Sequence, residues 1–351
     1  MKKYRVIIWG LGNVGKVALR MCQDKESLEL VGVIDTAPDK VGKDAGEVFG
    51  YGKTGVIISD NADEVLQIDA DVVLCYLPLV RDAELKFKPS GDDIIRALNA
   101  KKNVITTLPI SYQWATDPEL AEKLDQAAKA NGVTYAPMGF LPGHYGSYLP
   151  LVLGGLMERI DKITIASGED DQYNNSQWVH VFGYGVKPEE FTGPNFPYGG
   201  AKTLKRVIQT YYQDGVYEIG ARLGFNFTEV TSTHDIFTTP IPLKTVLKDV
   251  PAGTICGHRF KIMGMVGDQP AVTLDYVHRI CTDKVEEPKY RDVVRLEGSP
   301  AVIEVEYEGL ITLEQSYETS TAPSVNAIPN VVEAEPGYKN GLDLRVVVPI
   351  R

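Results

Sequence analysis

Several features that mark particular protein classes are scarce in this sequence. Its 351 residues include four cysteines, and none of them forms a CxxC pair with another. Neither a disulfide framework nor a zinc site is therefore expected. The five histidines show no spacing with Cys, Asp or Glu that is typical of metal ligands, so we expect no metal. No segment approaches the roughly 20 consecutive apolar residues that a membrane-spanning helix requires.

Positive charge is scarce as well. Lys and Arg number 36 against 47 Asp and Glu, which gives a formal net charge of -11, and no block of basic residues occurs. Binding to nucleic acid or to an anionic membrane surface needs such blocks, so neither partner is expected. The first residues lack the apolar core and the small-residue cleavage site of a secretory signal, which favours a cytoplasmic location.

What the sequence does contain begins with a glycine pattern. Residues 4–9 form an apolar run, and Gly10, Gly12 and Gly15 follow as GxGxxG before a helical pattern. Gly10 allows a tight strand-to-helix turn, Gly12 lets the backbone approach a pyrophosphate, and Gly15 lets the helix pack closely on the strand. The pyrophosphate then lies on free amides at the start of the helix. The pattern predicts a dinucleotide site that includes Asn13 and Val14.

An acidic residue follows at the spacing that this motif requires. Residues 28–35 read as a second strand that ends in Asp35, about twenty residues beyond the glycines. We expect Asp35, with the adjacent Thr36, to bind the adenosine ribose and to favour NAD. Lys40 and Lys43 are near enough in sequence to accept a 2′-phosphate, so NADP stays open. A simpler alternative is that Asp35 only caps the strand.

The first 145 residues alternate between short β-branched runs and helical patterns. The expected strands after the first two are 56–58, 71–76 and 103–107, and the expected helices include 92–101 and 117–131. This alternation predicts an α/β fold with a doubly wound parallel sheet of the Rossmann type. Such sheets bind ligands at the carboxyl ends of their strands. Further cofactor contacts are therefore predicted at Leu77, Pro78, Thr106 and Thr107.

The pattern changes near residue 146. A helix over 148–159, a strand over 160–166, a polar and aromatic stretch over 168–185 and a helix over 201–223 are followed by five strands, at 227–233, 256–266, 271–280, 292–296 and 301–307. This mostly antiparallel pattern predicts a second, α+β substrate domain over 146–321. Residues 322–351 are expected to form a short helix and a tail that pack back at the domain interface.

Several blocks of sequence carry a family resemblance. They are residues 40–47, 103–106, 111–115, 118–125, 128–133, 140–143, 183–191, 325–329 and 334–337. In these blocks the chain resembles the 2,4-diaminopentanoate dehydrogenases, which group with the native amine dehydrogenases and, more distantly, with dihydrodipicolinate reductase. The resemblance implies a homodimer in which NAD(P)H hands hydride to an imine carbon and the second domain supplies the dimer contacts and much of a small amine or ketone pocket. It also implies that Asn326 lies near the nicotinamide and that Phe140 and Leu141 line the cleft between the domains.

One departure from the family matters for chemistry. Between Thr106 and Ser111 the amine-forming relatives carry an acidic pair, one glutamate of which is the catalytic carboxylate. This chain has Thr107-Leu108-Pro109-Ile110 at that place and is one residue shorter. Reductive amination needs a titratable group there to handle the protons of ammonia and of the carbinolamine. Leu108 is instead predicted to contact substrate.

Replacements for the missing carboxylate are sought in the polar stretch of the second domain. We predict catalytic roles for Asp170, Tyr173, His180 and Tyr184, because carboxylates near aromatic rings and tyrosine hydroxyls can exchange protons with a substrate. Tyr173 and Trp178 are also predicted to line the substrate pocket. The alternatives are that residues 169–171 form a solvated charge run and that His180 is a packed structural residue.

The sequence therefore predicts an NAD(P)-dependent oxidoreductase and leaves its reaction open. An amine or imine reaction with a relocated base ranks first, followed by reduction of a ketone or aldehyde or oxidation of the matching alcohol, and then by reduction of a conjugated double bond. The other class is a non-catalytic dinucleotide-binding protein that has lost its base. A cofactor sensor has little need for so large a second domain, which favours the enzyme.

Overall fold

The computed structural model describes residues 2–78, 80–81, 87–88, 91–176, 178–281, 283–309 and 313–351. The chain divides into two compact units. Unit 1 comprises Met1–His144 and Tyr317–Arg351, and unit 2 comprises Tyr145–Ser316. The first division falls one residue before the predicted boundary, and the second falls inside helix α10 (Leu313–Asn326) rather than after residue 321.

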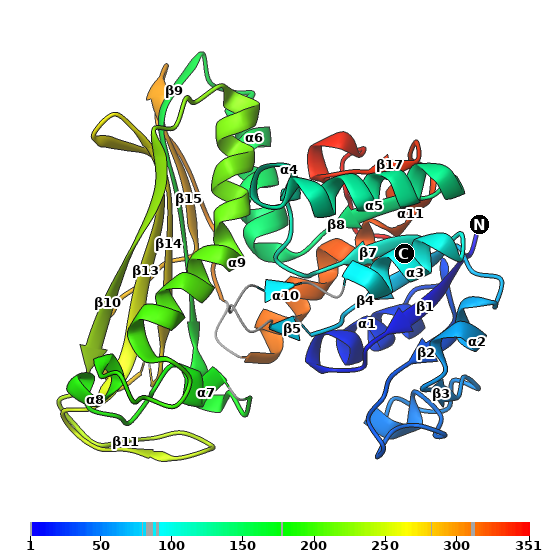
Figure 1. Ribbon diagram of the computed structural model, residues 1–351, viewed down its shortest axis with the longest axis horizontal. Coiled ribbons are helices and arrows are strands. Elements are labelled where there is room, and N and C mark those ends of the chain that lie inside the picture. Colours follow the sequence, from blue (N-terminus) through cyan, green and yellow to red (C-terminus); the bar gives the residue numbers. More distant parts are fainter. Residues whose placement is uncertain are drawn as a thin grey trace. The chain divides into compact units, whose positions relative to one another are not determined.

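Unit 1 is built on a parallel sheet with the strand order β17-β8-β7-β4-β1-β2-β3 (Figure 1). The strands are β1 (Tyr4–Trp9), β2 (Leu28–Ile34), β3 (Ile58–Ser59), β4 (Val72–Cys75), β7 (Asn103–Thr106), β8 (Thr134–Pro137) and β17 (Gly337–Tyr338). All neighbouring pairs in this sheet are parallel. The order reverses between β1 and β4, as in a doubly wound Rossmann sheet, so the predicted fold class is confirmed.

The helices of unit 1 carry clear start and stop signals. They are α1 (Asn13–Asp24), α2 (Ala62–Leu66), α3 (Gly91–Asn99), α4 (Gln113–Thr116), α5 (Pro118–Asn131) and α11 (Ile328–Val332), with most of α10. In α5, the Asp117 side chain accepts a hydrogen bond from the amide of Leu120, and Pro118 occupies the first turn. Gly132 ends the helix in the left-handed conformation, at φ 69°.

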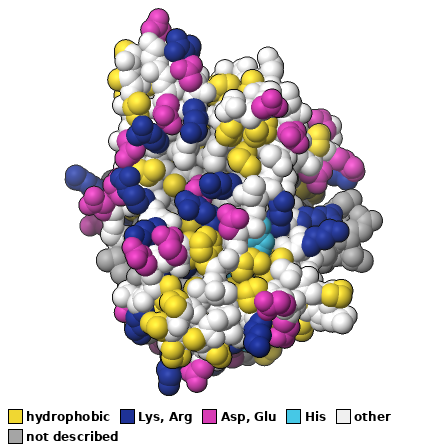
Figure 2. Space-filling view, turned by 90° about the vertical axis from the view of Figure 1, so that its left-hand side faces the viewer, with side chains coloured by type: hydrophobic (Ala, Val, Ile, Leu, Met, Phe, Trp, Pro, Cys, Tyr) yellow, Lys and Arg dark blue, Asp and Glu magenta, His cyan; other side chains and the backbone are white. Residues whose placement is uncertain are grey.

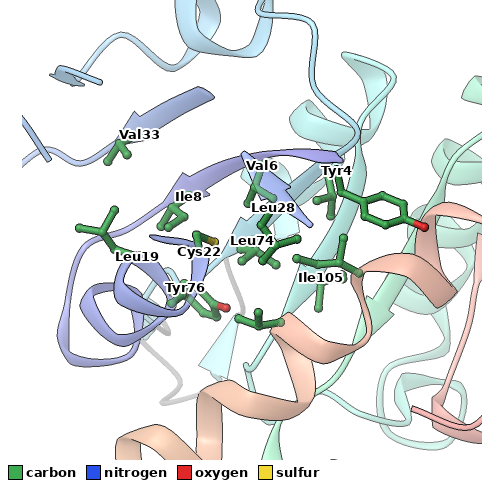
Figure 3. Packing of buried hydrophobic residues seen from close by; sticks show 14 of the residues in the cluster. Tyr4, Val6, Ile8, Leu19, Cys22, Leu28, Val33, Leu74, Tyr76 and Ile105 are labelled. Atoms are coloured by element: carbon green, nitrogen blue, oxygen red, sulfur yellow. The ribbon is translucent and has the colours of Figure 1, made fainter. Parts of the chain in front are cut away.

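Both faces of the unit 1 sheet are buried. Val6 and Ile8 of β1 belong to one hydrophobic cluster, whereas Ile7 and Trp9 belong to another on the opposite face. Figure 3 shows the first cluster, in which side chains of neighbouring strands meet Leu19 of α1. Continuous apolar strands of this kind require helices on both sides. The resulting rigid layer positions the loops at the carboxyl ends of the strands.

The carboxyl-terminal residues form an additional part of unit 1. The amide of Gly337 donates to the Val133 carbonyl, and β17 pairs with β8 in parallel. The sequence predicts a helix and a tail here, because β17 is short and polar residues flank it, so it cannot be recognised as a strand. α10 also begins nine residues earlier than the predicted boundary at 322.

Unit 2 contains a six-stranded sheet with the order β10-β13-β14-β9-β15-β16 (Figure 1). The strands are β9 (Arg159–Asp170), β10 (Glu229–Thr238), β13 (Ile255–Val266), β14 (Gln269–Arg279), β15 (Val293–Ser299) and β16 (Ile303–Glu306). The β9–β14 pair is parallel, and the other pairs are antiparallel. The long helix α9 (Gly200–Leu223) covers one face, and it agrees with the predicted helix over 201–223.

The opposite face of this sheet is crossed by ion pairs between strands. Arg259 of β13 makes a two-pronged contact with Asp275 of β14, with both N–O distances at 2.8 Å. Arg295 of β15 reaches Glu304 of β16 at 2.8 Å. Figure 2 looks onto this face and shows basic, acidic and hydrophobic side chains intermixed. Among the described residues of the whole chain, no helix has the length and apolar character needed to span a membrane.

Two differences from the predicted elements bear on the site. Only α6 (Leu149–Gly154) forms where a helix over 148–159 was expected, because Gly154 and Gly155 end it. Strand β9 continues to Asp170 instead of ending at residue 166, since Glu169 and Asp170 pair with His278 and Arg279 of β14. Polar side chains therefore lie within the sheet where the sequence indicated an irregular stretch.

Candidate active site

The glycine turn of unit 1 has the geometry that a dinucleotide site requires. Gly10 has φ +96°, a left-handed conformation that favours glycine. A Cβ on Gly15 would lie 1.9 Å from the Gly10 carbonyl oxygen, so α1 packs on β1 only because this side chain is absent. A Cβ on Gly12, by contrast, would meet nothing within 4 Å. The turn therefore keeps an open backbone surface at Gly12.

The amino-terminal end of α1 suits a pyrophosphate. Gly12 is the N-cap residue and supplies no side-chain hydrogen bond, and the first turn holds no acidic residue. The first amides of an α-helix have no partner within the helix and can bind an anion, and the helix dipole favours negative charge there. Asn13 and Val14 form the start of the helix, and Nδ2 of the Asn13 side chain donates to the Tyr317 hydroxyl at 2.8 Å. These residues fit the diphosphate of NAD(P).

Asp35 is tied to the glycine turn. Its Oδ2 accepts a hydrogen bond from the Leu11 amide at 2.6 Å, and its Oδ1 accepts one from the Ala37 amide at 2.8 Å. Lys40 lies beside it, with Nζ donating to the Leu11 carbonyl at 2.8 Å and lying 3.4 Å from Oδ2. Asp35 thus holds the loop in shape, and the neighbouring exposed Thr36 is open to solvent. The ribose contact stays a prediction.

The other predicted cofactor contacts lie where parallel strands end. Thr106 is buried and donates from its hydroxyl to the Cys75 carbonyl, which joins the ends of β7 and β4. Leu77 and Thr107 are half-buried, and Pro78 is exposed. Asn326 accepts a hydrogen bond from the Ile350 amide at 3.3 Å, so its side chain is engaged by the carboxyl-terminal tail. No described contact tests its proximity to the nicotinamide.

The turn at residues 107–110 is apolar and well packed. Leu108 and Ile110 are buried in a core cluster of unit 1, and the Leu108 amide donates to the Thr106 hydroxyl at 3.1 Å. The Ile110 carbonyl accepts from the Tyr338 hydroxyl at 3.1 Å. The turn is therefore fastened by β17, and Leu108 has a structural role here. Its predicted contact with substrate stays a prediction.

Phe140 and Leu141 follow β8. They begin the π-helical segment η2 (Phe140–Tyr148), and both are half-buried. Leu141 has extended backbone angles, φ -122° and ψ 129°, which interrupt the helical path. Both residues lie near the boundary of unit 1, and their predicted role in lining the substrate site is not tested by their own contacts.

The polar stretch of unit 2 is organised around Asp171. This fully buried carboxylate accepts a hydrogen bond from the Tyr184 hydroxyl at 2.7 Å on Oδ2. Nδ1 of His278 lies 3.1 Å from the same oxygen, and Nδ2 of the Asn174 side chain donates to Oδ1 at 2.8 Å. A buried carboxylate is stable only when its oxygens are satisfied in this way. Tyr184, which was predicted to be catalytic, therefore holds Asp171 in place.

Glu169 adjoins this group on the same face of the sheet. Its Oε1 accepts hydrogen bonds from the Tyr276 hydroxyl at 2.8 Å and from the Ser316 hydroxyl at 3.2 Å. Its Oε2 lies 4.0 Å from Nδ1 of His278. Glu169, Asp171 and His278 place possible metal-ligand atoms within 4.8 Å of one another. Because Asp171 already binds Tyr184 and His278, the arrangement is a hydrogen-bonded acid–base network.

Burial and charge shift the pKa values in this network. Burial alone lowers the pKa of His278, but the charge and hydrogen bond of Asp171 and the charge of Glu169 outweigh it, so this pKa is raised. Burial, followed by the charge of Asp171, raises the pKa of Tyr184 well above its ordinary value. Burial and then Glu169 do the same to the pKa of Tyr276. His278 is thus favoured as an imidazolium between two carboxylates.

The other predicted catalytic residues lie outside this network. Asp170 points to the neighbouring turn, where it accepts from the amides of Gln172 and Cys281 at 2.9 and 3.0 Å. Tyr173 is 60% exposed, and His180 is exposed on α7 (Trp178–Val181). Trp178 packs edge-on against Tyr211 of α9. Their catalytic and substrate-binding roles stay predictions.

From the sequence, Glu169 and Asp171 belong to the polar stretch in which a replacement carboxylate is sought, but neither is singled out, and His278 has no predicted role. The register of β9 against β14 brings Glu169 beside His278, although the two are far apart in the chain. Tyr276 and Tyr212 complete the surroundings, with their ring centres 4.8 Å apart. The spacing of Glu169 and His278 along the sequence gives no sign that they are neighbours, because their contact depends on the parallel pairing of β9 with β14.

Comparison with known families accounts for most of the chain. The family described as dihydrodipicolinate reductase, N-terminus, matches residues 4–76. The family described as 2,4-diaminopentanoate dehydrogenase C-terminal domain matches residues 147–351, which is more than half of the chain. The first match covers the glycine turn and Asp35, and the second covers the Glu169–Asp171–His278 network.

Whole-length relatives agree with these matches. An amine dehydrogenase of Streptomyces virginiae is 28% identical, with 96% of this chain and 95% of the relative covered. A 2,4-diaminopentanoate dehydrogenase of Acetoanaerobium sticklandii is 26% identical, with 99% and 94% covered. The solved amine dehydrogenase of Mycobacterium smegmatis has the same fold, with a TM-score of 0.76, 21% identity, and 98% of this chain and 97% of that chain covered. The predicted class, an NAD(P)-dependent oxidoreductase, is confirmed. The chain belongs to the 2,4-diaminopentanoate dehydrogenase family, as its sequence blocks predicted.

Proposed function

We propose that this protein transfers hydride between NAD(P) and a small amine, imine or carbonyl compound. The observation that carries the proposal is the glycine turn, where the open backbone at Gly12 and the uncapped start of α1 fit a pyrophosphate. The two curated relatives are named as dehydrogenases of amines, and their similarity extends over nearly the whole chain. These names support an amine or its imine as the substrate.

Each residue of the cofactor half has a distinct task in this proposal. Gly10 and Gly15 shape the turn, Gly12 and Asn13 receive the diphosphate, and Asp35 receives the ribose while it holds the Leu11 amide. When bound, NAD(P) supplies or accepts the hydride. Lys40 partly neutralises the charge of Asp35, so this site tolerates the 2′-phosphate of NADP. Lys40 does not, however, offer that phosphate a bidentate hydrogen-bond partner.

The test is a spectrophotometric assay of NADH and NADPH oxidation with a panel of small ketones and aldehydes, with and without ammonium. We expect turnover that depends on ammonium for at least one carbonyl compound. Oxidation of the matching amines with NAD or NADP is the reverse assay. If no compound in either direction is turned over although NADH binds tightly, the proposed function is wrong and a non-catalytic dinucleotide-binding role takes its place.

Reduction of a carbonyl group without ammonia is the second candidate. The observation in its favour is the turn at residues 107–110, where Leu108 and Ile110 are buried in the core and no carboxylate is present. Hydride transfer to a ketone needs only a proton donor to the alkoxide. The exposed Tyr173 is a suitable donor. Turnover that is independent of ammonium and yields the alcohol would favour this candidate.

A homodimer is also proposed. The support is the family resemblance together with the face of the unit 2 sheet that α9 leaves uncovered, where both signs of charge and hydrophobic side chains are intermixed (Figure 2). A mixed face of this kind can be complementary to itself across a two-fold axis. Light scattering coupled to gel filtration distinguishes a dimer from a monomer of 38.6 kDa. A cytoplasmic location stays a prediction from the sequence.

A further inference from the structure

Glu169 is a carboxylate with one engaged oxygen and one available oxygen. Tyr276 and Ser316 both donate to Oε1. The side chain is 31% exposed, and among the described residues its one ion-pair neighbour is His278, 4.0 Å from Oε2. That distance is too long for a hydrogen bond. In the same sheet, the similarly exposed Glu297 is approached by both a lysine and an arginine at 3.7 Å.

The surroundings of Oε2 favour a cation. Two carboxylates, Glu169 and Asp171, share a single imidazole, so the group keeps negative charge even when His278 is protonated. Aromatic rings lie next to it, with Tyr276 in edge contact with His278 at 4.8 Å and Tyr212 at 4.8 Å from Tyr276. A carboxylate oxygen beside aromatic rings attracts ammonium groups through charge-assisted hydrogen bonds and cation–π interactions.

We infer that Glu169 binds the ammonium ion, or the ammonium group of the amine substrate, and exchanges a proton with it. This inference rests on the proposed amine reaction, and it assigns to unit 2 the proton chemistry for which the turn at 107–110 has no carboxylate. Tyr276 and Ser316 are positioning residues, because both hold Oε1 and so direct Oε2 away from them. His278 and Asp171 are positioning residues behind the carboxylate.

The proton balance in the direction of amination is complete. The Glu169 carboxylate takes one proton from ammonium, and the ammonia forms a C–N bond with the carbonyl carbon while a second proton moves from nitrogen to the carbonyl oxygen. The hydroxyl then leaves as water with the proton held by Glu169, and the C=N carbon takes the hydride. Ketone, ammonium and NAD(P)H thus give amine, NAD(P)+ and water. General acid–base catalysis of this kind contributes about 10²- to 10⁴-fold.

A binding experiment tests the inference without relying on turnover. Ring ¹H–¹⁵N signals of His278, assigned by their loss in His278→Asn, are followed while ammonium chloride is added to the full chain with NADH. Sodium chloride at equal ionic strength is the control. We expect a saturable shift that Glu169→Gln abolishes and that Glu297→Gln preserves. A shift retained in Glu169→Gln, or no shift beyond that of sodium chloride in the wild type, would overturn the inference.

Kinetics supply the second arm. In Glu169→Gln we expect kcat with ammonium to fall by about 10²- to 10⁴-fold, while NADH affinity, measured by fluorescence titration, stays that of the wild type. Wild-type kcat in this variant would overturn the inference even if amine turnover is established. Failure of the proposed function would be a separate result. Saturable ammonium binding at Glu169 without turnover of any carbonyl compound would support the binding site and refute the proposed reaction.

Discussion

Two glycines of the same turn should respond to alanine in opposite ways. At Gly15 the added Cβ would lie 1.9 Å from the Gly10 carbonyl oxygen, and real Cβ atoms essentially never come closer than 3.0 Å. Helix α1 would have to move by at least the difference, 1.1 Å, against backbone that cannot yield. Overpacking of this kind costs about 1–3 kcal/mol. Gly15→Ala should therefore lower the free energy of unfolding by at least that amount.

At Gly12 the same substitution meets open space. Its backbone angles, φ -75° and ψ -162°, are accessible to alanine, and nothing lies within 4 Å of the added Cβ. We expect a stability change below about 0.5 kcal/mol. The methyl group would instead occupy the approach of the pyrophosphate, and the loss of charge-assisted contacts worth about 1.5–3 kcal/mol weakens NADH binding by about 10- to 100-fold.

The assay pairs urea unfolding with NADH fluorescence titration for the wild type, Gly12→Ala and Gly15→Ala. We expect Gly12→Ala to weaken NADH binding without a change in the free energy of unfolding, and Gly15→Ala mainly to lower the free energy of unfolding. Unchanged NADH affinity in Gly12→Ala would refute the placement of the pyrophosphate on this turn. Wild-type stability in Gly15→Ala would refute the close packing of α1 on β1.

Three further changes have distinct expected results. Asp35→Asn should weaken binding of NAD more than that of NADP, because the ribose loses its acceptor, and equal losses in calorimetric titrations would contradict the ribose contact. Burial lowers the pKa of His234 to about 4, so unfolding takes up a proton as the pH falls from about 6.5 to 4, and the free energy of unfolding drops by about 3 kcal/mol over that window. His234→Gln should flatten this dependence in urea unfolding measured against pH. An unchanged slope in the variant would contradict the lowered pKa. Tyr184→Phe should cost about 1–3 kcal/mol by leaving buried Asp171 without one donor, with the exposed Tyr173→Phe as a matched control that changes little in the same measurement.

The cofactor half was predictable because its signals are local. Gly10, Gly12 and Gly15 act within one turn, and the apolar run before them has to be a strand buried on both faces. The helix α5 was equally readable from Asp117 and Gly132, which cap it. Each of these predictions depends on residues within a few positions of one another, where propensity and backbone geometry decide the outcome.

The loop after β2 shows the limit of such reading. From the sequence, residues 40–47 form a family block in which Lys40 and Lys43 are possible contacts of a 2′-phosphate, yet Asp44 is the centre of the loop. Its carboxylate accepts hydrogen bonds from four backbone amides and from the Thr54 hydroxyl. Despite the opposing effect of burial, these bonds lower the pKa of Asp44 to about 2. The donors to Asp44 come from both sides of the loop, so its role cannot be recognised before the path of the loop is known.

The acid–base network of unit 2 was missed because strand β9 was ended too early. Side chains alternate between the faces of a strand, so Ile163 and Ile165, both fully buried, share their face with Glu169. If the predicted strand is extended to Asp170, this alternation places the side chain of Glu169, and not that of Asp170, on the face of the sheet that α9 covers. Asp170 instead turns to the amides at the strand end. Which of Glu169 and Asp170 joins the network thus depends on where strand β9 ends. The polar residues at the end of β9 hide this end in the sequence, because it is set by the parallel pairing with His278 and its neighbours.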